Sequence, residues 1–300
     1  MISPLMHSRL LTHLSAAIHA ATHRPFEACS ATPIGGGSIN QAFRLEGSDG
    51  ARYFLKLNDA RHHAMFAAEA EGLYEIAATD TIRVPLPISH GIADHQSYLV
   101  LEHLQLSSRG DANLLGEQLA ALHRCKSAQF GFARDNFIGT TPQPNGWKEN
   151  WIDFWHEHRL GFQLQLAAEH GYGGQLQRLG EKLLDVLPAF FAGYTPQPSL
   201  LHGDLWGGNH AYTGDGAPVI FDPATYYGDR EADLAMTELF GGYDPEFHAA
   251  YRAHYPLDAG YATRKNLYNL YHILNHANLF GGGYAKQAEQ MMQRLLAEIG

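Results

Sequence analysis

The chain has 300 residues, of which 45% are hydrophobic and 17% are charged, a composition typical of a globular protein with a full core. Its formal net charge of −10 argues against nucleic acid or an anionic membrane as the main partner. Two cysteines, Cys29 and Cys125, are too few for a disulfide framework, and no apolar run approaches the length of a membrane span. We therefore expect a cytoplasmic protein, without a nucleic-acid or membrane partner, that is long enough for two domains or lobes.

The first third of the chain predicts a small unit that mixes helix and strand. Residues 1–20 have an amphipathic helical pattern and lack the unbroken apolar region of a signal peptide. Two β-prone runs, 42–45 and 52–57, flank a Gly/Asp turn and predict a hairpin. The other elements expected here are a glycine-rich turn at 31–37, a helix at 60–78, an extended segment at 84–88 and a strand at 97–104.

The remainder of the chain is mostly helical in pattern. We expect helices at 114–124, 150–169, 176–190 and 263–298, a loop at 139–146, and short apolar strands at 199–201 and 219–221. The predicted fold class is α+β, with a small β-rich N-lobe over residues 1–101 and a larger, mainly helical C-lobe over residues 102–300.

Three oxygen-bearing side chains follow the two short apolar strands. Asp204 and Asn209 lie five residues apart in LLHGDLWGGN (200–209), and Asp222 ends the next strand in VIFDPA. Phosphoryl transfer needs such a set, because one carboxylate accepts the proton of the attacking hydroxyl while an amide and a second carboxylate hold Mg²⁺. A kinase catalytic loop has the same order. Turn formation is the alternative for each residue alone, and the ordered trio favours catalysis.

Lys56 lies in the middle of the strand YFLKLN, where a kinase keeps the lysine that contacts the ATP phosphates. The alternative is an exposed lysine on an edge strand. In the following helix, Glu69 falls on the apolar stripe, whereas Glu71 points away from it. A carboxylate on a buried face needs a cation, so we predict that Glu69 is the partner of Lys56.

A run of glycines precedes the first β-prone segment: Gly35, Gly36 and Gly37, followed by Ser38 and Asn40. The backbone N–H groups of such a loop can approach phosphate closely. The run matches neither the nucleoside-triphosphate P-loop nor the dinucleotide fingerprint, and a flexible turn is the alternative. Its position about twenty residues ahead of Lys56 favours a loop that covers the phosphates of ATP.

These stretches together resemble the fructosamine kinases (ketosamine-3-kinases), a branch of the aminoglycoside-phosphotransferase-like kinases. The segments that carry the resemblance include GGGSINQAFRL (35–45), HGDLWGGN (202–209), FDPATYYGDREADLAM (221–236) and LYNLYHILNHANLFG (267–281). The resemblance implies a protein-kinase-like fold and the cofactors ATP and Mg²⁺. It implies these roles: Asp204 as the proton acceptor, Asn209 and Asp222 as Mg²⁺ ligands, Lys56 and Glu69 as the phosphate-anchoring pair, and Glu102, His103 and Leu104 as the hinge that holds adenine.

The resemblance also implies an activity. The substrate is a small-molecule or protein-linked ketoamine, which is phosphorylated on its 3-hydroxyl and then releases its amine. Which ketosamine is used, and the oligomeric state, stay open. The alternatives are another small-molecule kinase, of the aminoglycoside or choline kinase type, and a kinase-like module without catalysis. The second alternative predicts the loss of Lys56, Asp204, Asn209 or Asp222, yet all four are present.

Several single residues carry weaker signals. The substrate-facing candidates are Trp206, Asp229, Arg230, Asn275 and His276, and for each a structural role is the alternative. Asp233 either caps a helix or braces the catalytic loop. His272 and His276 have zinc-like spacing without an evident third ligand.

Overall fold

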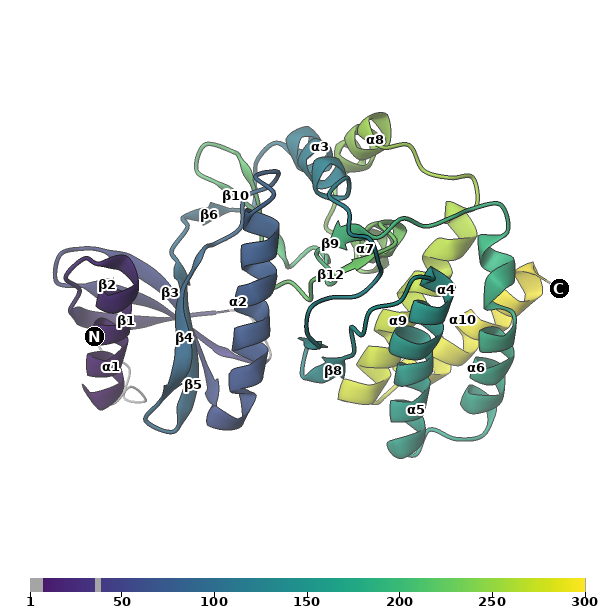
Figure 1. The fold of residues 1–300 in the computed structure, drawn as a ribbon, viewed down its shortest axis with the longest axis horizontal. Coiled ribbons are helices and arrows are strands. Elements are labelled where there is room, and N and C mark those ends of the chain that lie inside the picture. The colour runs from purple at the N-terminus through teal and green to yellow at the C-terminus, as the bar shows by residue number, and fades with distance from the viewer. Residues whose placement is uncertain (1–7, 36–38, 300) are drawn as a thin grey trace. The chain divides into compact units, whose positions relative to one another are not determined.

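The computed structural model describes residues 8–35 and 39–299, which form two compact units. The first unit contains the chain up to Gly110 and the segment Ala211–Phe221, and the second contains Asp111–His210 and Asp222–Gly300 (Figure 1). The boundary between residues 101 and 102 stays a prediction. Within the described ranges, no helix has the length and apolar character needed to cross a membrane.

A five-stranded antiparallel sheet forms the centre of the first unit, with strands in the order β1-β2-β3-β5-β4. The expected hairpin is confirmed as β2 and β3. The strands are β1 (Ala28–Ile34), β2 (Gln41–Gly47), β3 (Arg52–Asp59), β4 (Pro87–Ala93) and β5 (Gln96–Glu102), and the helices are α1 (Ser8–Thr22), the 3-10 turn Ala60–His62 and α2 (His63–Ala77). Figure 1 shows the sheet between α1 and α2.

The alternation of side chains along β3 explains how both faces of this sheet are covered. Leu55 and Leu57 belong to the core that α1 completes, together with Val100 on β5. Lys56 lies between them and therefore points to the opposite face, where its cross-strand neighbours are Ala42 and Leu99. The register of β3 thus determines that Lys56 faces away from α1.

A smaller three-stranded sheet completes the first unit. It contains β6 (Leu106–Ser107), β10 (His210–Thr213) and β11 (Pro218–Ile220), in the order β11-β10-β6. A single bridge joins Val219 to Arg83. Strand β11 confirms the second expected short strand, at 219–221, and it begins and ends one residue earlier than expected.

Helices dominate the second unit. They are α3 (Ala112–Leu122), α4 (Trp151–Trp155), α5 (Gly161–Glu169), α6 (Gln175–Asp185), α7 (Glu231–Leu239), α8 (Pro245–His254), α9 (Tyr261–Phe280) and α10 (Tyr284–Glu298). Two strand pairs accompany them: β7 (Asn136–Ile138) with β8 (Thr141–Gln143), and β9 (Ser199–Leu201) with β12 (Tyr226–Gly228). The core between the helices is rich in aromatic residues, with Trp155, Phe154 and Tyr268 fully buried.

Several expected boundaries are wrong, each for a local reason. Residues 31–34 belong to β1 and not to a turn, and the loop at 139–146 contains β8. The helix expected to reach residue 190 ends at Asp185, because Pro188 cannot continue it, and a 3-10 turn follows. The last helical region is interrupted at Gly281 and Gly282, which have φ values of +66° and +65°. The helix at 150–169 is continuous but contains a π turn at His156–Leu160.

The buried histidine on α9 generates a prediction about stability. Burial, with a contribution from His276, lowers the pKa of His272 to about 3. The unfolded chain therefore binds a proton near pH 6.5 that the folded chain does not, so stability is fully present above pH 6.5 and falls below it. We expect His272→Leu to remove this component, about 2 kcal/mol between pH 7 and pH 5. Denaturant unfolding of the wild-type protein and of His272→Leu at pH 7 and pH 5 measures this component. If the free energy of unfolding changed equally with pH in the two proteins, the assignment to His272 would be contradicted.

Candidate active site

The loop after β9 carries two of the three predicted catalytic side chains. It turns sharply at Gly203, whose φ is +85° and which lies so close to the next loop that a Cβ there would be 2.1 Å from the carbonyl oxygen of Ala224. Asp204 follows and is half-buried, and Asn209 is buried. Position 203 needs glycine, because its backbone angle disfavours a side chain and the carbonyl of Ala224 leaves no room for one.

The side-chain amide of Asn209 links Asp204 to Asp222. The Nδ2 atom donates to the carbonyl oxygen of Asp204 at 2.9 Å and lies 3.5 Å from the carbonyl oxygen of Asp222. Asp222 is exposed and has a φ of +58°, a left-handed conformation that is uncommon for residues other than glycine. The structure therefore brings the predicted trio together within the second unit.

Asp233, in the first turn of α7, braces the catalytic loop. Its Oδ2 accepts from the backbone N–H of His202 at 2.7 Å, and its Oδ1 accepts from that of Gly203 at 2.8 Å. The ring of His123 lies between Asp233, 3.2 Å from Nε2, and the hydroxyl of Tyr251, 2.7 Å from Nδ1. Burial disfavours the ionised form of Asp233, yet the hydrogen bond from His123 and the nearby histidines keep its pKa below the usual value. Of the two roles considered for Asp233, the brace is the one observed.

The electrostatics of this loop suit proton transfer. Burial, with the negative charges of Asp222 and Asp233, raises the pKa of Asp204 to about 7. A carboxylate that titrates near neutral pH is a better proton acceptor than an ordinary exposed aspartate. A side-chain hydrogen bond from Asn209 works in the opposite direction and favours the ionised form.

The same residues present ligands suited to a hard cation. The carboxylate of Asp222 is exposed, and the amide nitrogen of Asn209 faces the backbone, so the amide oxygen is the ligand atom that remains. Oxygen ligands of this kind suit Mg²⁺. Among residues 8–35 and 39–299, no group of three or more His, Cys, Asp or Glu side chains is arranged to hold a metal ion. Mg²⁺ at this loop would therefore take further ligands from phosphate oxygens and water, as it usually does.

The predicted pair in the first unit is present. The Nζ atom of Lys56 lies 2.7 Å from Oε1 of Glu69, and both side chains are almost fully buried. Glu71 is exposed, so the choice of Glu69 as the partner is confirmed. The ion pair holds the ammonium group at a fixed place on the face of the sheet that α2 covers.

Asn58 is a further residue of this region that the sequence patterns did not single out. Its Nδ2 donates to Oδ1 of Asn40 at 2.7 Å and to the carbonyl oxygen of Ile39 at 3.3 Å. It thereby ties the end of the glycine run to β3, two residues after Lys56. Gly35 is described, whereas Gly36, Gly37 and Ser38 lie outside the described residues.

Of the expected hinge residues, Glu102 ends β5, and His103 and Leu104 follow it; all three are half-buried. The carboxylate of Glu102 pairs with Arg83 and accepts from the backbone N–H of Leu86 at 3.3 Å. Burial lowers the pKa of the His103 imidazole, and Arg44 and Arg52 add to this effect. Leu104 continues the segment beyond the strand. The side chain of Glu102 is thus engaged within the first unit, which leaves recognition to the backbone if adenine binds here.

Three of the substrate candidates lie on or beside the catalytic loop and α9. Trp206 is 41% exposed, and its ring covers Gly208. Asn275 is buried, where its Oδ1 accepts from Gln163 at 3.3 Å and its Nδ2 donates to the carbonyl oxygen of Ile138 at 3.3 Å. His276 is half-buried, with aromatic rings around it. Trp206 and His276 therefore retain surface for a ligand.

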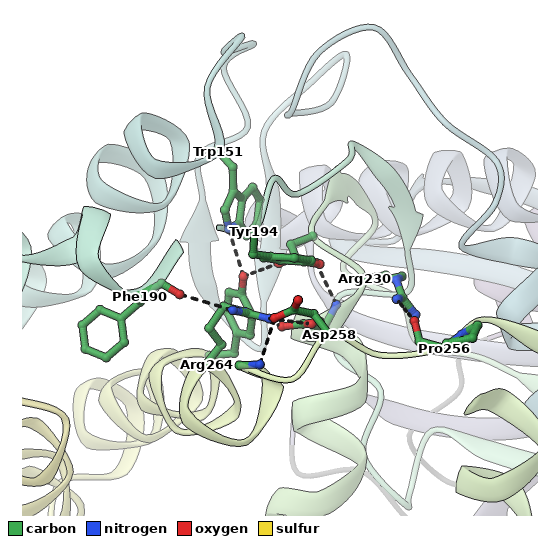
Figure 2. A network of polar contacts seen from close by, with 11 residues as sticks. Trp151, Phe190, Tyr194, Arg230, Pro256, Asp258 and Arg264 are labelled. Carbon is green, nitrogen blue, oxygen red and sulfur yellow. Dashed lines mark hydrogen bonds and ion pairs between the residues drawn. The ribbon is translucent and has the colours of Figure 1, made fainter. Parts of the chain in front are cut away.

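The other two candidates are buried in a polar network that Figure 2 shows. Asp229 is fully buried and accepts from the hydroxyls of Tyr194 at 2.9 Å and Tyr268 at 2.5 Å. Arg230 donates to the carbonyl oxygens of Tyr255 and Pro256 and stacks 3.6 Å from the centre of the Tyr255 ring. Both side chains are committed to contacts that hold the start of α7, which argues for structural roles.

Comparisons with known proteins agree with this geometry. A family model described as fructosamine kinase matches residues 10–298. A Synechocystis protein named a probable ketoamine kinase is 49% identical over 287 residues, which cover 94% of this chain and 96% of that protein. A chloroplastic protein-ribulosamine 3-kinase from Oryza sativa subsp. indica is 41% identical over 267 residues, which cover 88% of this chain and 78% of that protein.

A solved structure supports the fold in the same way. The crystal structure of a fructosamine-3-kinase candidate from Haemophilus somnus superposes with a TM-score of 0.85 at 29% identity, and the match covers 94% of this chain and 96% of that one. The likeness to kinases of known structure confirms the predicted protein-kinase-like fold, with a sheet-rich smaller part and a helical larger part.

The tight turn at Gly203 generates a test of the loop. We expect Gly203→Ala to lower the free energy of unfolding by at least about 2 kcal/mol, because it adds both backbone strain and a clash with Ala224. Gly193→Ala is the matched control, since Gly193 has a φ of +79° and nothing within 4 Å of an added Cβ. Denaturant unfolding of both variants measures the difference. An equal loss of the free energy of unfolding in Gly203→Ala and Gly193→Ala would mean that the close approach to Ala224 does not constrain the loop.

The buried ion pair gives a second test. Glu69→Gln removes the carboxylate beside Lys56 and should cost about 3 kcal/mol, since a buried cation then loses a counter-charge. Glu71→Gln should change the free energy of unfolding by no more than about 0.5 kcal/mol, because Glu71 is exposed. Both values come from denaturant unfolding. A similar effect of the two substitutions would contradict the importance of the pair.

Proposed function

The chain belongs to the fructosamine kinase family, and from this premise we propose that it transfers the γ-phosphoryl group of ATP to the 3-hydroxyl of a ketoamine. As a member of a kinase family it is a phosphotransferase that binds a nucleotide. The observation that carries the proposal is the loop in which Asp204, Asn209 and Asp222 converge while Asp233 holds its backbone.

In the proposed reaction, Asp204 orients the 3-hydroxyl and accepts its proton. A bond forms between the 3-oxygen and the γ-phosphorus, and the bond from that phosphorus to the β,γ-bridging oxygen breaks, so that ADP leaves. The position of Asp204 beside Asn209, on the turn that Asp233 holds, supports this role. Most of the rate comes from positioning and charge neutralisation, as is general for phosphoryl transfer.

Other residues of the chain orient the nucleotide in this proposal. Asn209 and Asp222 would hold Mg²⁺, which would neutralise charge on the phosphate oxygens when bound. Lys56, kept in place by Glu69, contacts the α- and β-phosphates. The segment 35–40 supplies backbone N–H groups to the phosphates, and the backbone of residues 102–104 holds adenine.

The substrate class follows from the relatives. One relative is named a ketoamine kinase and another a protein-ribulosamine 3-kinase, so we propose ribulosamines or fructosamines, free or on a protein, as substrates. Trp206 and His276 have surface with which to contact the sugar. We also propose a cytoplasmic location, for which the two free cysteines are the support. An aminoglycoside or choline kinase is not favoured, because the ketoamine kinase match spans almost the whole chain.

The first measurement is ADP release with Mg-ATP against ribulosyl-lysine, fructosyl-lysine, choline and kanamycin. We expect turnover of at least one ketoamine, and a loss of kcat of at least about 10³-fold in Asp204→Asn, because the amide cannot accept the proton. ATP binding by that variant, measured by calorimetry, should be retained.

Each other outcome has a definite meaning. Turnover of choline or kanamycin alone would overturn the ketoamine assignment and leave the kinase fold untouched. Full activity of Asp204→Asn on a ketoamine would overturn the role of Asp204 as the base. Asp215→Asn is the matched control, because that exposed aspartate lies in the turn between β10 and β11, outside the catalytic loop.

A further inference from the structure

Four aromatic side chains gather at one edge of the second unit and form what we term the aromatic rim: Phe240, His276, Phe280 and Tyr284. The ring of His276 lies 5.1 Å from Phe240, 5.6 Å from Phe280 and 5.1 Å from Tyr284, measured between ring centroids. Phe240 is 45% exposed and Phe280 is 57% exposed. Phe240 and Phe280, two large apolar side chains, are thus exposed to water, and both contact the ring of His276. Such exposed patches commonly mark binding surfaces.

The rim adjoins the catalytic loop through the backbone that follows Phe240. A Cβ on Gly207 would lie 2.7 Å from the carbonyl oxygen of Gly241, so the two segments are in contact. Gly207 is three residues after Asp204, and Gly241 directly follows Phe240. The rim therefore borders the site of phosphoryl transfer, within one unit of the structure.

We propose that the aromatic rim binds the amine side of the substrate, namely the hydrocarbon stem of a modified lysine. This inference rests on the proposed function, since it names the part of the ketoamine that lies beyond the sugar. The sugar binds beside Asp204, and the amine substituent extends from there across Phe240 and Phe280.

The chemistry of a lysine-linked ketoamine fits this surface. Its nitrogen is a cationic secondary amine, and four methylene groups follow it. Aromatic faces bind methylene groups by apolar contact and tolerate an adjacent cation, because the face of the ring carries partial negative charge. Long cationic side chains bury their stems along apolar surface in the same way. A polyhydroxylated amine substituent would instead need hydrogen-bonding groups, which two phenylalanines do not provide.

The test uses two ketoamines that share the ribulosyl group and differ in the amine: a blocked Nε-ribulosyl-lysine and ribulosyl-methylamine. Wild-type protein should prefer the lysine compound. We expect Phe240→Ala and Phe280→Ala each to raise KM for it by about 3- to 30-fold, the range typical of one lost aromatic contact. KM for the methylamine compound should change by less than about 2-fold, and kcat should stay unchanged on both, as for binding that is equal in ground and transition states.

Ile92→Ala is the matched control, because Ile92 is an equally exposed apolar residue of the first unit, at 52%. It should leave both KM values unchanged. An equal rise in KM for the two ketoamines would overturn the proposal, because it would mean that the rim only maintains the shape of the site. An unchanged KM for the lysine compound in both phenylalanine variants would overturn it as well. A change of oligomeric state in Phe280→Ala, seen by analytical ultracentrifugation with equal kinetics on both compounds, would assign the rim to contact between copies of the chain.

A second measurement separates this inference from the proposed function. Calorimetry reports binding of both compounds to each protein without turnover. Wild-type protein that binds the lysine compound and never phosphorylates it would overturn the proposed function, while selective weakening by the two variants would still support the rim. Equal affinity of wild-type protein for the two compounds would overturn the rim and leave the proposed function standing.

Discussion

One buried carboxylate, that of Asp233, determines the geometry of the catalytic loop. The loop turns so sharply at Gly203 that the N–H groups of residues 202 and 203 point at α7 and away from any strand partner. Buried N–H groups without an acceptor cost free energy comparable to a lost hydrogen bond, so the carboxylate of Asp233 stabilises this one backbone conformation. Asp204 is the next residue, and its position follows from the turn. His123 and Tyr251 in turn hold Asp233, which links the loop to α3 and α8.

The helix that carries Asp233 is anchored by other buried charges. Arg264 on α9 donates to both oxygens of Glu231 at 2.7 and 3.1 Å, and Asp229 accepts from two tyrosine hydroxyls (Figure 2). Burial raises the pKa of Glu231, and the ion pair with Arg264 opposes that rise. Because such pairs are costly unless every partner is present, the network specifies how α7 and α9 pack. The catalytic brace at one end of α7 and the aromatic rim at its other end therefore depend on the same contact between helices.

The sequence patterns succeeded where a residue's role depends on its neighbours in the chain. The apolar stripe of α2 identified Glu69 as the buried partner of Lys56, because helical periodicity determines which carboxylate shares the buried face. The loop around Asp204 and Asn209 was equally clear, since strand, glycine and spacing are all local. The patterns failed at residues 31–34 and 139–146, where strands form only because a partner strand is available. For Asp229 and Arg230 they left a substrate contact and a structural role open, and the structure buries both side chains.

The sequence by itself determined the fold class and the ion pair of the first unit, and it singled out the trio at residues 204, 209 and 222 that the structure brings together. The choice of Glu69 depends on helical periodicity, and the trio depends on spacings of five and thirteen residues, which the chain carries wherever it folds. Only the tertiary structure decided that Asp233 braces the loop, that Asp229 is buried, and that Phe240 and Phe280 meet around His276. Apart from the contact of His276 with Phe280 within α9, those relations join residues that lie from 30 to 110 positions apart. Contacts over such separations arise from packing between elements, and no local pattern in the chain encodes them.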